Sequence, residues 1–234
     1  MKDLSIVVPA YNERDNLPRI IKRFEDIVRK YEQIDMELII VENGSADGSN
    51  DYLMDIGNEN IGVVHLKENR GYGGGIMAGL KKAKGEYLCW THADLQTDLK
   101  DAIRAYRLAN GKSDVFVKGR RKRRSLSESI FTGGMTIFES ILFMMPLTDI
   151  NAQPNLFHKS MLELCHNPPK DFSFDLFMYV MSKKNKLRIH RFPVRFWRRE
   201  HGESKWNTGI SSKVKFIKRT IRYSFRLRRD MTCR

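Results

Sequence analysis

The short polar segment His92-Ala93-Asp94-Leu95-Gln96 has side chains that could hold a metal ion. Asp94 and Gln96 stand two residues apart after an apolar run, so both can aim oxygen atoms in the same direction. Hard divalent cations prefer oxygen ligands, and an enzyme that handles a diphosphate needs such a cation. Considered on spacing alone, the same two side chains could instead cap a following helix.

A glycine-rich segment, Gly71-Tyr72-Gly73-Gly74-Gly75, is a second candidate for chemistry. It does not match the G-x-G-x-x-G pattern of dinucleotide-binding proteins, because Ile76 and Ala78 stand where a third glycine is required. It also follows the third predicted strand, whereas that pattern follows the first. The glycines therefore either let the backbone approach a sugar or phosphate, or open a tightly packed helix.

The segments that must position these loops alternate between short apolar runs and stretches of helical periodicity. This alternation is typical of βαβ units and predicts an α/β fold with a mainly parallel central sheet and flanking helices. In such a sheet, ligands bind beyond the carboxyl ends of the strands, so the loops after the strands should converge on one crevice. The predicted strands are 4–8, 36–41, 61–66, 87–90 and 114–117, the helices 16–32, 49–56, 74–83 and 98–109, and the loops 9–13, 42–48, 67–75, 92–98 and 118–124.

After residue 125 the pattern changes. An apolar helix is expected over 126–145, a strand over 155–158, helices near 160–166 and 173–183, and a strand over 187–195. The final helix, about 210–229, is basic and amphipathic, with one apolar stripe of Val214, Ile217, Ile221 and Phe225 that ends at Arg228. Without repeats or low-complexity linkers, one domain over 1–209 and a helical tail over 210–234 are expected.

Charge is concentrated in two segments. The 234-residue chain has a formal net charge of +14. Residues 1–117 are net −3, residues 118–124 are +6 and residues 191–234 are +11. This distribution favours a local contact with an anionic surface over general nucleic-acid binding. Three cysteines exclude a disulfide framework or zinc ribbon and suggest a reducing compartment.

Five segments, in this order and spacing, resemble the family 2 inverting glycosyltransferases. The resemblance is strongest to the dolichyl-phosphate mannose synthases and related polyprenyl-phosphate glycosyltransferases. It covers the chain from residue 4 to about 205 and implies a single GT-A-type domain with a nucleotide-binding half, about 1–124, and an acceptor-binding half, about 125–209. The segments are VVPAYNE at 7–13, VENGSADGS at 41–49, NRG at 69–71, ADLQ at 93–96 and REHGESK at 199–205.

The resemblance also implies roles for residues in the first loops. The base and ribose of the donor nucleotide are expected against Pro9, Tyr11, Glu13, Glu42, Asn43, Ser45 and Gly71. The family usually has two aspartates where Glu42 and Asn43 stand here, which leaves the choice of base open.

Asp94 and Gln96 match the two positions that hold Mg²⁺ or Mn²⁺ in dolichyl-phosphate mannose synthases. His92 replaces the first acid of the family's D-x-D motif. It could be a third ligand, a hydrogen-bond partner of the sugar or a polar residue at a strand end, and we favour the last two.

Phosphate groups are expected against arginine and lysine side chains. Arg120 stands where this subfamily places an arginine on the donor diphosphate or the acceptor phosphate, and its bidentate donors suit that role. Its neighbours, residues 121–124, are expected to face anionic lipid headgroups. Arg199, Ser204 and Lys205 match the family's clamp on the acceptor phosphate.

The expected reaction is metal-dependent transfer of a sugar, with inversion, from a nucleoside-diphosphate sugar to a polyprenyl phosphate. Such an acceptor is already anionic and needs no general base. If the acceptor is instead a sugar hydroxyl, Asp175 is the candidate base, although it could also be an exposed helix carboxylate. A third possibility is a catalytically impaired scaffold, suggested by the altered residues 42, 43 and 92.

The location expected for this protein is the cytoplasm, in peripheral contact with a membrane. No targeting signal is visible, and the apolar stretch 130–147 is interrupted by glycines, Glu139 and Pro146, so a spanning helix is not expected. The expected partners are a nucleotide sugar, a lipid-linked acceptor and an anionic membrane surface, with no nucleic acid. The sequence leaves the oligomeric state open, and it leaves open whether the 210–229 helix binds a membrane, a partner or its own domain.

Overall fold

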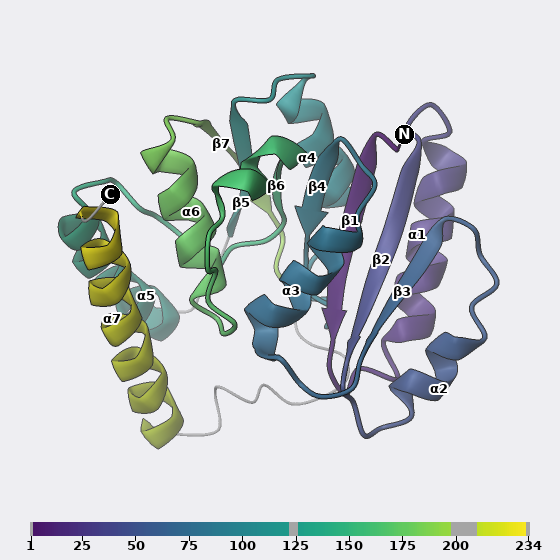
Figure 1. Ribbon diagram of the computed structural model, residues 1–234, viewed down its shortest axis with the longest axis horizontal. Helices are drawn as coiled ribbons and strands as arrows, with labels where there is room; N and C mark the ends of the chain where they lie inside the picture. Colours follow the sequence, from purple (N-terminus) through teal and green to yellow (C-terminus); the bar gives the residue numbers. More distant parts are fainter. Residues whose placement is uncertain (1, 122–125, 198–209, 233–234) are drawn as a thin grey trace.

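A seven-stranded sheet forms the centre of the protein (Figure 1). The computed structural model describes residues 2–121, 126–197 and 210–232. The strand order is β3-β2-β1-β4-β6-β5-β7, and only β6 runs antiparallel to its two neighbours. The strands are β1 Leu4–Ala10, β2 Met36–Asn43, β3 Ile61–Leu66, β4 Tyr87–Trp90, β5 Val115–Arg121, β6 Asn155–His158 and β7 Arg188–Val194.

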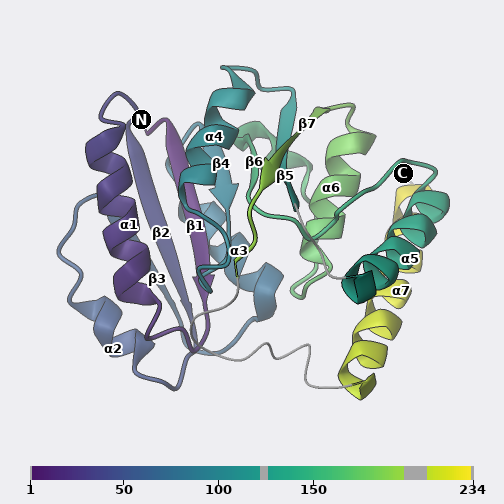
Figure 2. The ribbon, with the colours of Figure 1, turned by 180° about the vertical axis from the view of Figure 1, so that it is seen from behind.

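Helices cover both faces of this sheet. The helices are α1 Leu17–Lys30, α2 Ser49–Met54, α3 Gly71–Lys82, α4 Lys100–Ala109, α5 Leu126–Phe143, α6 Phe174–Lys184 and α7 Ile210–Thr232, with a 3-10 turn at Lys159–Leu164. In Figure 1, α3 and α6 lie in front of the sheet, and Figure 2 shows α1 and α4 in front of the opposite face.

Two hydrophobic cores follow from this arrangement, because side chains alternate between the faces of each strand. Ile6 and Val8 of β1 pack with Phe24 of α1 and Ile103 of α4. Val7, between them, packs on the opposite face with residues of α3 and α6. Strands β1, β2 and β4 are thus buried on both sides, which explains why they read as near-continuous apolar runs.

The expected α/β class, the parallel sheet and nearly all of its elements are confirmed. Two boundaries differ in ways that matter for the site. Strand β5 continues through 118–121, where a loop was expected, because these residues pair with residues 191–194 of β7 and the Lys118 side chain is completely buried. Helix α3 begins at Gly71, three residues earlier than predicted, so the glycine-rich segment is the first turn of a helix.

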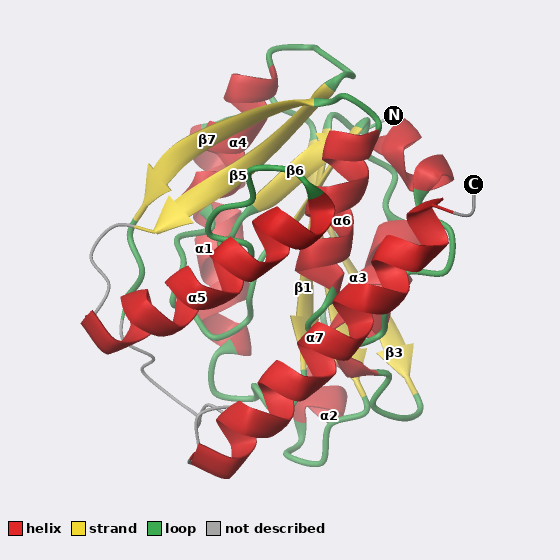
Figure 3. Ribbon diagram, turned by 90° about the vertical axis from the view of Figure 1, so that its left-hand side faces the viewer, coloured by secondary structure: helices red, strands yellow, loops and turns green. Residues whose placement is uncertain are grey.

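Helices α5 and α7 lie against each other on the outside of the protein (Figure 3). Ser224 and Leu227 of α7 are buried, and Leu227 belongs to the core that also holds α3 and α6. The tail thus packs on its own chain, chiefly through residues outside the predicted stripe, although Phe225 of the stripe also contacts Phe138 of α5. Phe225 is 55% exposed, Ile217 and Ile221 are half-buried, and the side chain of Val214 lies outside the described residues.

No helix in the described part of the chain is both long and apolar enough to cross a membrane.

Candidate functional site

The loops after the parallel strands meet at one edge of the sheet. The arrowheads of β1 and β4 point to the lower side in Figure 1, and β2, β3, β5 and β7 run in the same direction. Most residues that the sequence marks for chemistry follow these strands. The predicted convergence of the first four loops at this edge is therefore present, as an α/β sheet requires.

Hydrogen bonds join the loop after β1 to the loop after β2. The backbone N–H of Asn12 donates to Ser45 Oγ at 3.0 Å, and Asn12 Oδ1 accepts from the N–H of Ala46 at 2.9 Å. The Arg14 N–H donates to Asp47 Oδ2 at 2.9 Å. Asn12 and Asp47 were not singled out from the sequence, although they lie inside the quoted 7–13 and 41–49 motifs. Pro9, Tyr11 and Glu13 are half-buried beside this junction.

Glu42 shapes a polar hollow next to the junction. Its carboxylate is 2% exposed and accepts from the backbone N–H groups of Gly44, at 3.2 Å, and Ser45, at 2.6 Å. The hollow is lined by Glu42, Gly44, Ser45, Ala46, Gly48, Asn50, Asp51, Leu66 and Lys67. A carboxylate that accepts two backbone N–H groups fixes the loop around it, so Glu42 has a structural role that the sequence did not indicate.

Asn43 connects the end of β2 to the start of α3. Its Nδ2 donates to the Gly71 carbonyl at 3.1 Å, and its Oδ1 accepts from the Arg70 N–H at 3.0 Å. Gly71 has a φ of +78°, and a Cβ placed on it would lie 2.4 Å from the Lys170 carbonyl oxygen. Only glycine fits there, so packing against the 169–171 loop alone explains this glycine.

The segment 91–97 is a tight loop anchored in the core. Leu95 is 6% exposed and packs with the first core, at a φ of +57° that is rare for a branched side chain. The hydroxyls of Thr91 and Thr97 lie 2.8 Å apart and close the loop. Asp94 is itself 6% exposed, like Leu95, whereas Gln96 is half-buried.

Two contacts fix this loop against the end of β7. Gln96 Nε2 donates to the Trp197 carbonyl at 3.1 Å, and the Trp197 N–H donates to the Gln96 carbonyl at 2.8 Å. The Gln96 N–H donates to Asp94 Oδ1 at 3.1 Å. The residue that leads into the 198–209 segment is therefore held beside Asp94 and Gln96.

The oxygen donors of this loop fit a divalent cation shared with a substrate. Asp94 offers a carboxylate, and the bonded Gln96 amide turns its oxygen away from the Trp197 carbonyl. Among the described residues, no group of three or more His, Cys, Asp or Glu could hold a metal ion. One carboxylate and one amide on the protein correspond to the type of Mg²⁺ site in which substrate phosphates and water complete the coordination.

His92 belongs to a stack of three rings. Its ring lies 5.6 Å from that of Tyr72, and the Tyr72 ring lies 4.8 Å from the ring of Phe172. These residues come from the end of β4, the first turn of α3 and the turn before α6. This stack could not be predicted from the sequence, because its members are far apart in the chain. His92 is half-buried beside Asp94, as expected of a polar residue at a strand end.

Asp175 lies beneath this stack, and its expected alternative as an exposed helix carboxylate is wrong. It is 2% exposed. Oδ1 accepts from Trp90 Nε1 at 3.1 Å and from Gln153 Nε2 at 3.0 Å, while Oδ2 accepts from the Tyr72 hydroxyl at 3.2 Å. Burial raises the pKa of Asp175, against the opposing charge of Lys118. With three donors converging on it, this carboxylate is placed to hold Tyr72 and Trp90 in position.

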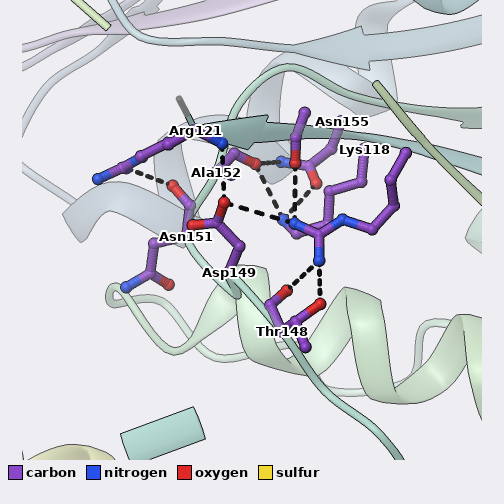
Figure 4. A network of polar contacts seen from close by, with 9 residues as sticks. Lys118, Arg121, Thr148, Asp149, Asn151, Ala152 and Asn155 are labelled. Carbon is purple, nitrogen blue, oxygen red and sulfur yellow. Dashed lines mark hydrogen bonds and ion pairs between the residues drawn. The ribbon is translucent and has the colours of Figure 1, made fainter. Parts of the chain in front are cut away.

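Lys118 extends the buried network toward β6 (Figure 4). Its Nζ donates to the Ala152 carbonyl at 2.9 Å and to Asn155 Oδ1 at 2.7 Å. Burial lowers the pKa of Lys118 to about 7. The buried Lys118 amine thus supports the 148–155 loop, whereas the sequence predicted that Lys118 lies in an exposed basic loop.

Arg120 is exposed at the carboxyl end of β5, as a phosphate-binding arginine would be. The expectation that Arg121 faces lipid headgroups is wrong. Its Nη2 donates to the Asn151 carbonyl at 2.6 Å, and its guanidinium lies 4.3 Å from the Phe196 ring centroid. Residues 122–124 lie outside the described residues. So do Arg199, Ser204 and Lys205, and their assignment to the acceptor phosphate stays a prediction.

Comparison with known proteins supplies an independent line of evidence. Residues 5–155 match the family model described as Glycosyl transferase family 2. The dolichyl-phosphate beta-glucosyltransferase of Dictyostelium discoideum is 28% identical over a 247-residue alignment that covers 95% of this chain and 74% of that protein. The undecaprenyl-phosphate 4-deoxy-4-formamido-L-arabinose transferase of Proteus mirabilis is 36% identical over 124 residues. That match covers 52% of this chain but only 38% of the relative, so the chain aligns with well under half of that protein.

Among solved structures, the fold is similar to glucosyl-3-phosphoglycerate synthase from Mycobacterium tuberculosis. In its complex with Mn²⁺, uridine-diphosphate-glucose and glycerol 3-phosphate, that enzyme superposes with a TM-score of 0.72 at 15% identity, covering 97% of this chain and 80% of that chain. At this level of identity the similarity establishes the GT-A architecture alone.

Proposed function

The chain belongs to glycosyl transferase family 2 and is a glycosyltransferase, and from this premise we propose that it moves a sugar, with inversion, from a nucleoside-diphosphate sugar to a polyprenyl phosphate. The similarity to a dolichyl-phosphate beta-glucosyltransferase and an undecaprenyl-phosphate 4-deoxy-4-formamido-L-arabinose transferase supports this acceptor class. We place the protein in the cytoplasm, in peripheral contact with the membrane that holds such a lipid.

The observation that carries the proposal is the position of Asp94 and Gln96 at the same sheet edge as the polar hollow beside Glu42. A nucleoside in the hollow would direct its diphosphate along the edge toward the 91–97 loop. Asp94 and Gln96 would hold Mg²⁺ or Mn²⁺ there. When bound, this cation neutralises charge that develops on the departing diphosphate. Pro9, Tyr11, Glu13, Asn43, Ser45 and Gly71 would bind or shape the nucleotide site.

The acceptor phosphate would be bound by cationic side chains. Arg120 is exposed at the end of β5, and we assign Arg199, Ser204 and Lys205 to the same phosphate. A phosphate oxygen is anionic near neutral pH and attacks without losing a proton, so the reaction requires no general base. Transfer to a sugar hydroxyl would require one. The three donors that already occupy Asp175 disfavour it as that base.

A donor screen tests the proposal. Bound ligand stabilises only the folded state, so the matching nucleotide sugar should raise the melting temperature in the presence of Mn²⁺. Asp94→Ala should abolish the Mn²⁺-dependent part of this shift. Asp98→Ala is the matched control, because Asp98 is exposed and its side chain accepts from the Lys100 N–H at the start of α4.

Transfer is then measured with the matching donor and a short-chain prenyl phosphate. We expect a glycosylated prenyl phosphate as the product. A protein that binds no nucleotide sugar, or that binds one equally well without a metal, would contradict the proposed function and support a scaffold role.

A further inference from the structure

We propose that helices α5 and α7 together form a face that binds an anionic lipid surface. This inference rests on the proposed lipid acceptor and identifies the surface of the protein that would contact the membrane. The face differs from the single amphipathic helix expected from the sequence, because α5 provides most of its apolar side chains.

The apolar part of the face is a stripe on α5. Ile137 is 63% exposed, Ile141 is 72% exposed and Met144, directly after the helix, is 80% exposed. They are spaced four and three residues apart, which places Ile137 and Ile141 on one side of the helix, with Met144 in the turn that follows it. These are three of the four most exposed large apolar side chains among the described residues. Scattered apolar residues are normal on a protein surface, but a continuous stripe indicates a contact.

A second stripe, on α7, carries the charge. Lys218, Arg222 and Arg229 are exposed, and they flank the exposed ring of Phe225 at the same four-and-three spacing. Two contacts join the stripes. The rings of Phe138 and Phe225 meet edge to face at 5.9 Å, and Arg228 Nη2 lies 3.6 Å from Met144 Sδ. The two helices therefore present apolar and cationic side chains side by side.

The rest of the described fold does not cover this face. The opposite side of α7 is already packed, with Ser224 bonded to Glu139 and Leu227 in the core. Figure 3 shows both helices outermost, with the sheet behind them. In Figure 1, α7 begins on the lower side, where the carboxyl ends of the strands lie, and it ends on the upper side.

The positive charge of this face favours an anionic partner. The described residues of α7 include one acid, Asp230, which pairs with Arg229 at 3.7 Å. Cations beside an anionic lipid surface contribute about 1 kcal/mol each, while exposed apolar side chains enter the headgroup region. A symmetric contact with a second copy would bring the same cations together and is disfavoured.

Vesicle flotation tests the proposal with the full chain. We expect binding to vesicles of equal parts phosphatidylcholine and phosphatidylglycerol, and little binding to phosphatidylcholine alone. The double variant Ile137→Asp, Ile141→Asp should bind at least about 10-fold more weakly, since both side chains are lost from the lipid contact. Arg222→Gln with Lys218→Gln should weaken binding about 10- to 30-fold.

Two control variants test whether a loss of vesicle binding is specific to the face formed by α5 and α7. Met54→Asp alters an apolar residue on α2 that is 69% exposed, and Lys81→Gln with Lys82→Gln removes two exposed cations from α3. Both controls should bind like the unchanged protein. The proposal is overturned if the Ile137, Ile141 variant still binds, if the controls lose binding equally, or if the face instead mediates a dimer that this variant dissociates.

The same variants separate this proposal from the proposed function. Transfer to a water-soluble short-chain prenyl phosphate should be unchanged in the Ile137, Ile141 variant, while transfer to a long-chain acceptor in anionic vesicles should fall. Vesicle binding without transfer to either acceptor would contradict the proposed function and leave the lipid-binding face intact.

Discussion

Asn43 Nδ2 donates to the carbonyl oxygen of Gly71 at 3.1 Å, which joins the loop after β2 to the first turn of α3. The same amide accepts from the Arg70 N–H through Oδ1. An aspartate, which the family usually has at this position, could make only the second contact, because a carboxylate has no N–H to donate. The asparagine is thus explained by a structural requirement of this chain.

Asn43→Asp should therefore destabilise the protein. The Gly71 carbonyl would lose its donor and face a carboxylate, at a cost of about 1–3 kcal/mol in the free energy of unfolding. Urea denaturation measures this loss. Asn12→Asp is the control, since the Asn12 side chain acts as an acceptor from Ala46 and an aspartate retains that role. Equal stability of the two variants would show that the bond to Gly71 contributes nothing.

Asp175→Asn tests whether this residue positions others or removes a proton. An amide offers one acceptor oxygen to Trp90, Gln153 and Tyr72, so at least one buried donor loses its partner, at a cost of about 1–3 kcal/mol. Transfer to a prenyl phosphate should fall together with stability, and the shape of its pH profile should not change, because no proton is removed.

Tyr72→Phe is the milder companion variant. It removes one donor to Asp175 and keeps the ring between His92 and Phe172, so a loss of about 1 kcal/mol is expected. A normal melting temperature for Asp175→Asn, combined with loss of transfer and an altered pH profile, would instead identify Asp175 as a base.

The sequence predicted most of the fold because its signals are local. A buried parallel sheet requires continuous apolar strands, and these alternate with clear helical periodicity along 1–117. The end of β5 was not predicted, because the contacts that define it are not local in the sequence. Lys118 looks like the start of a basic loop, and only its contacts with Ala152 and Asn155, more than 30 residues away, reveal a buried strand position.

The position of the candidate site, like most of the fold, was predictable from the sequence. Loops that follow parallel strands must meet, so the proximity of the 9–13, 42–48 and 92–98 loops follows from the fold class. The side chains that fix these loops could not be foreseen. The stack of Tyr72 on His92 and Phe172, and the donation of Trp90 to Asp175, join residues separated by 20 to 100 positions. Trp90, within an apolar strand, is indistinguishable from a core residue.

Leu95→Ala should weaken the metal site as well as the fold. Leu95 anchors the 91–97 loop in the core, and truncation should cost about 2–4 kcal/mol in stability. Asp94 and Gln96 on the same loop would lose their fixed positions, so Mn²⁺-dependent nucleotide binding should also fall when measured by calorimetry at a temperature where the variant is folded. Ile27→Ala in α1 is the control, and an equal loss of Mn²⁺ dependence there would contradict the anchoring role.

The contact between α5 and α7 should depend on pH because of Glu139. It is completely buried, and burial raises its pKa to about 7. Ser224 Oγ lies 2.7 Å from Glu139 Oε1 and 2.8 Å from the Thr220 carbonyl, but one hydroxyl proton cannot serve both acceptors. A protonated Glu139 resolves this conflict by donating to Ser224, while the hydroxyl donates to Thr220.

The protein should therefore lose stability as the pH rises from about 4.5, the carboxyl's ordinary pKa, through about 7. Over this range the unfolded chain releases the Glu139 proton before the folded chain does, which favours unfolding. Glu139→Gln stays neutral, so it should match the unchanged protein near pH 4.5 and exceed its stability by roughly 1–3 kcal/mol at pH 8. Denaturant titrations at both pH values, with hydrogen exchange to follow α7, measure the difference. The assignment fails if the two proteins have parallel pH profiles, because Glu139 would then carry the same charge in the folded and unfolded chain.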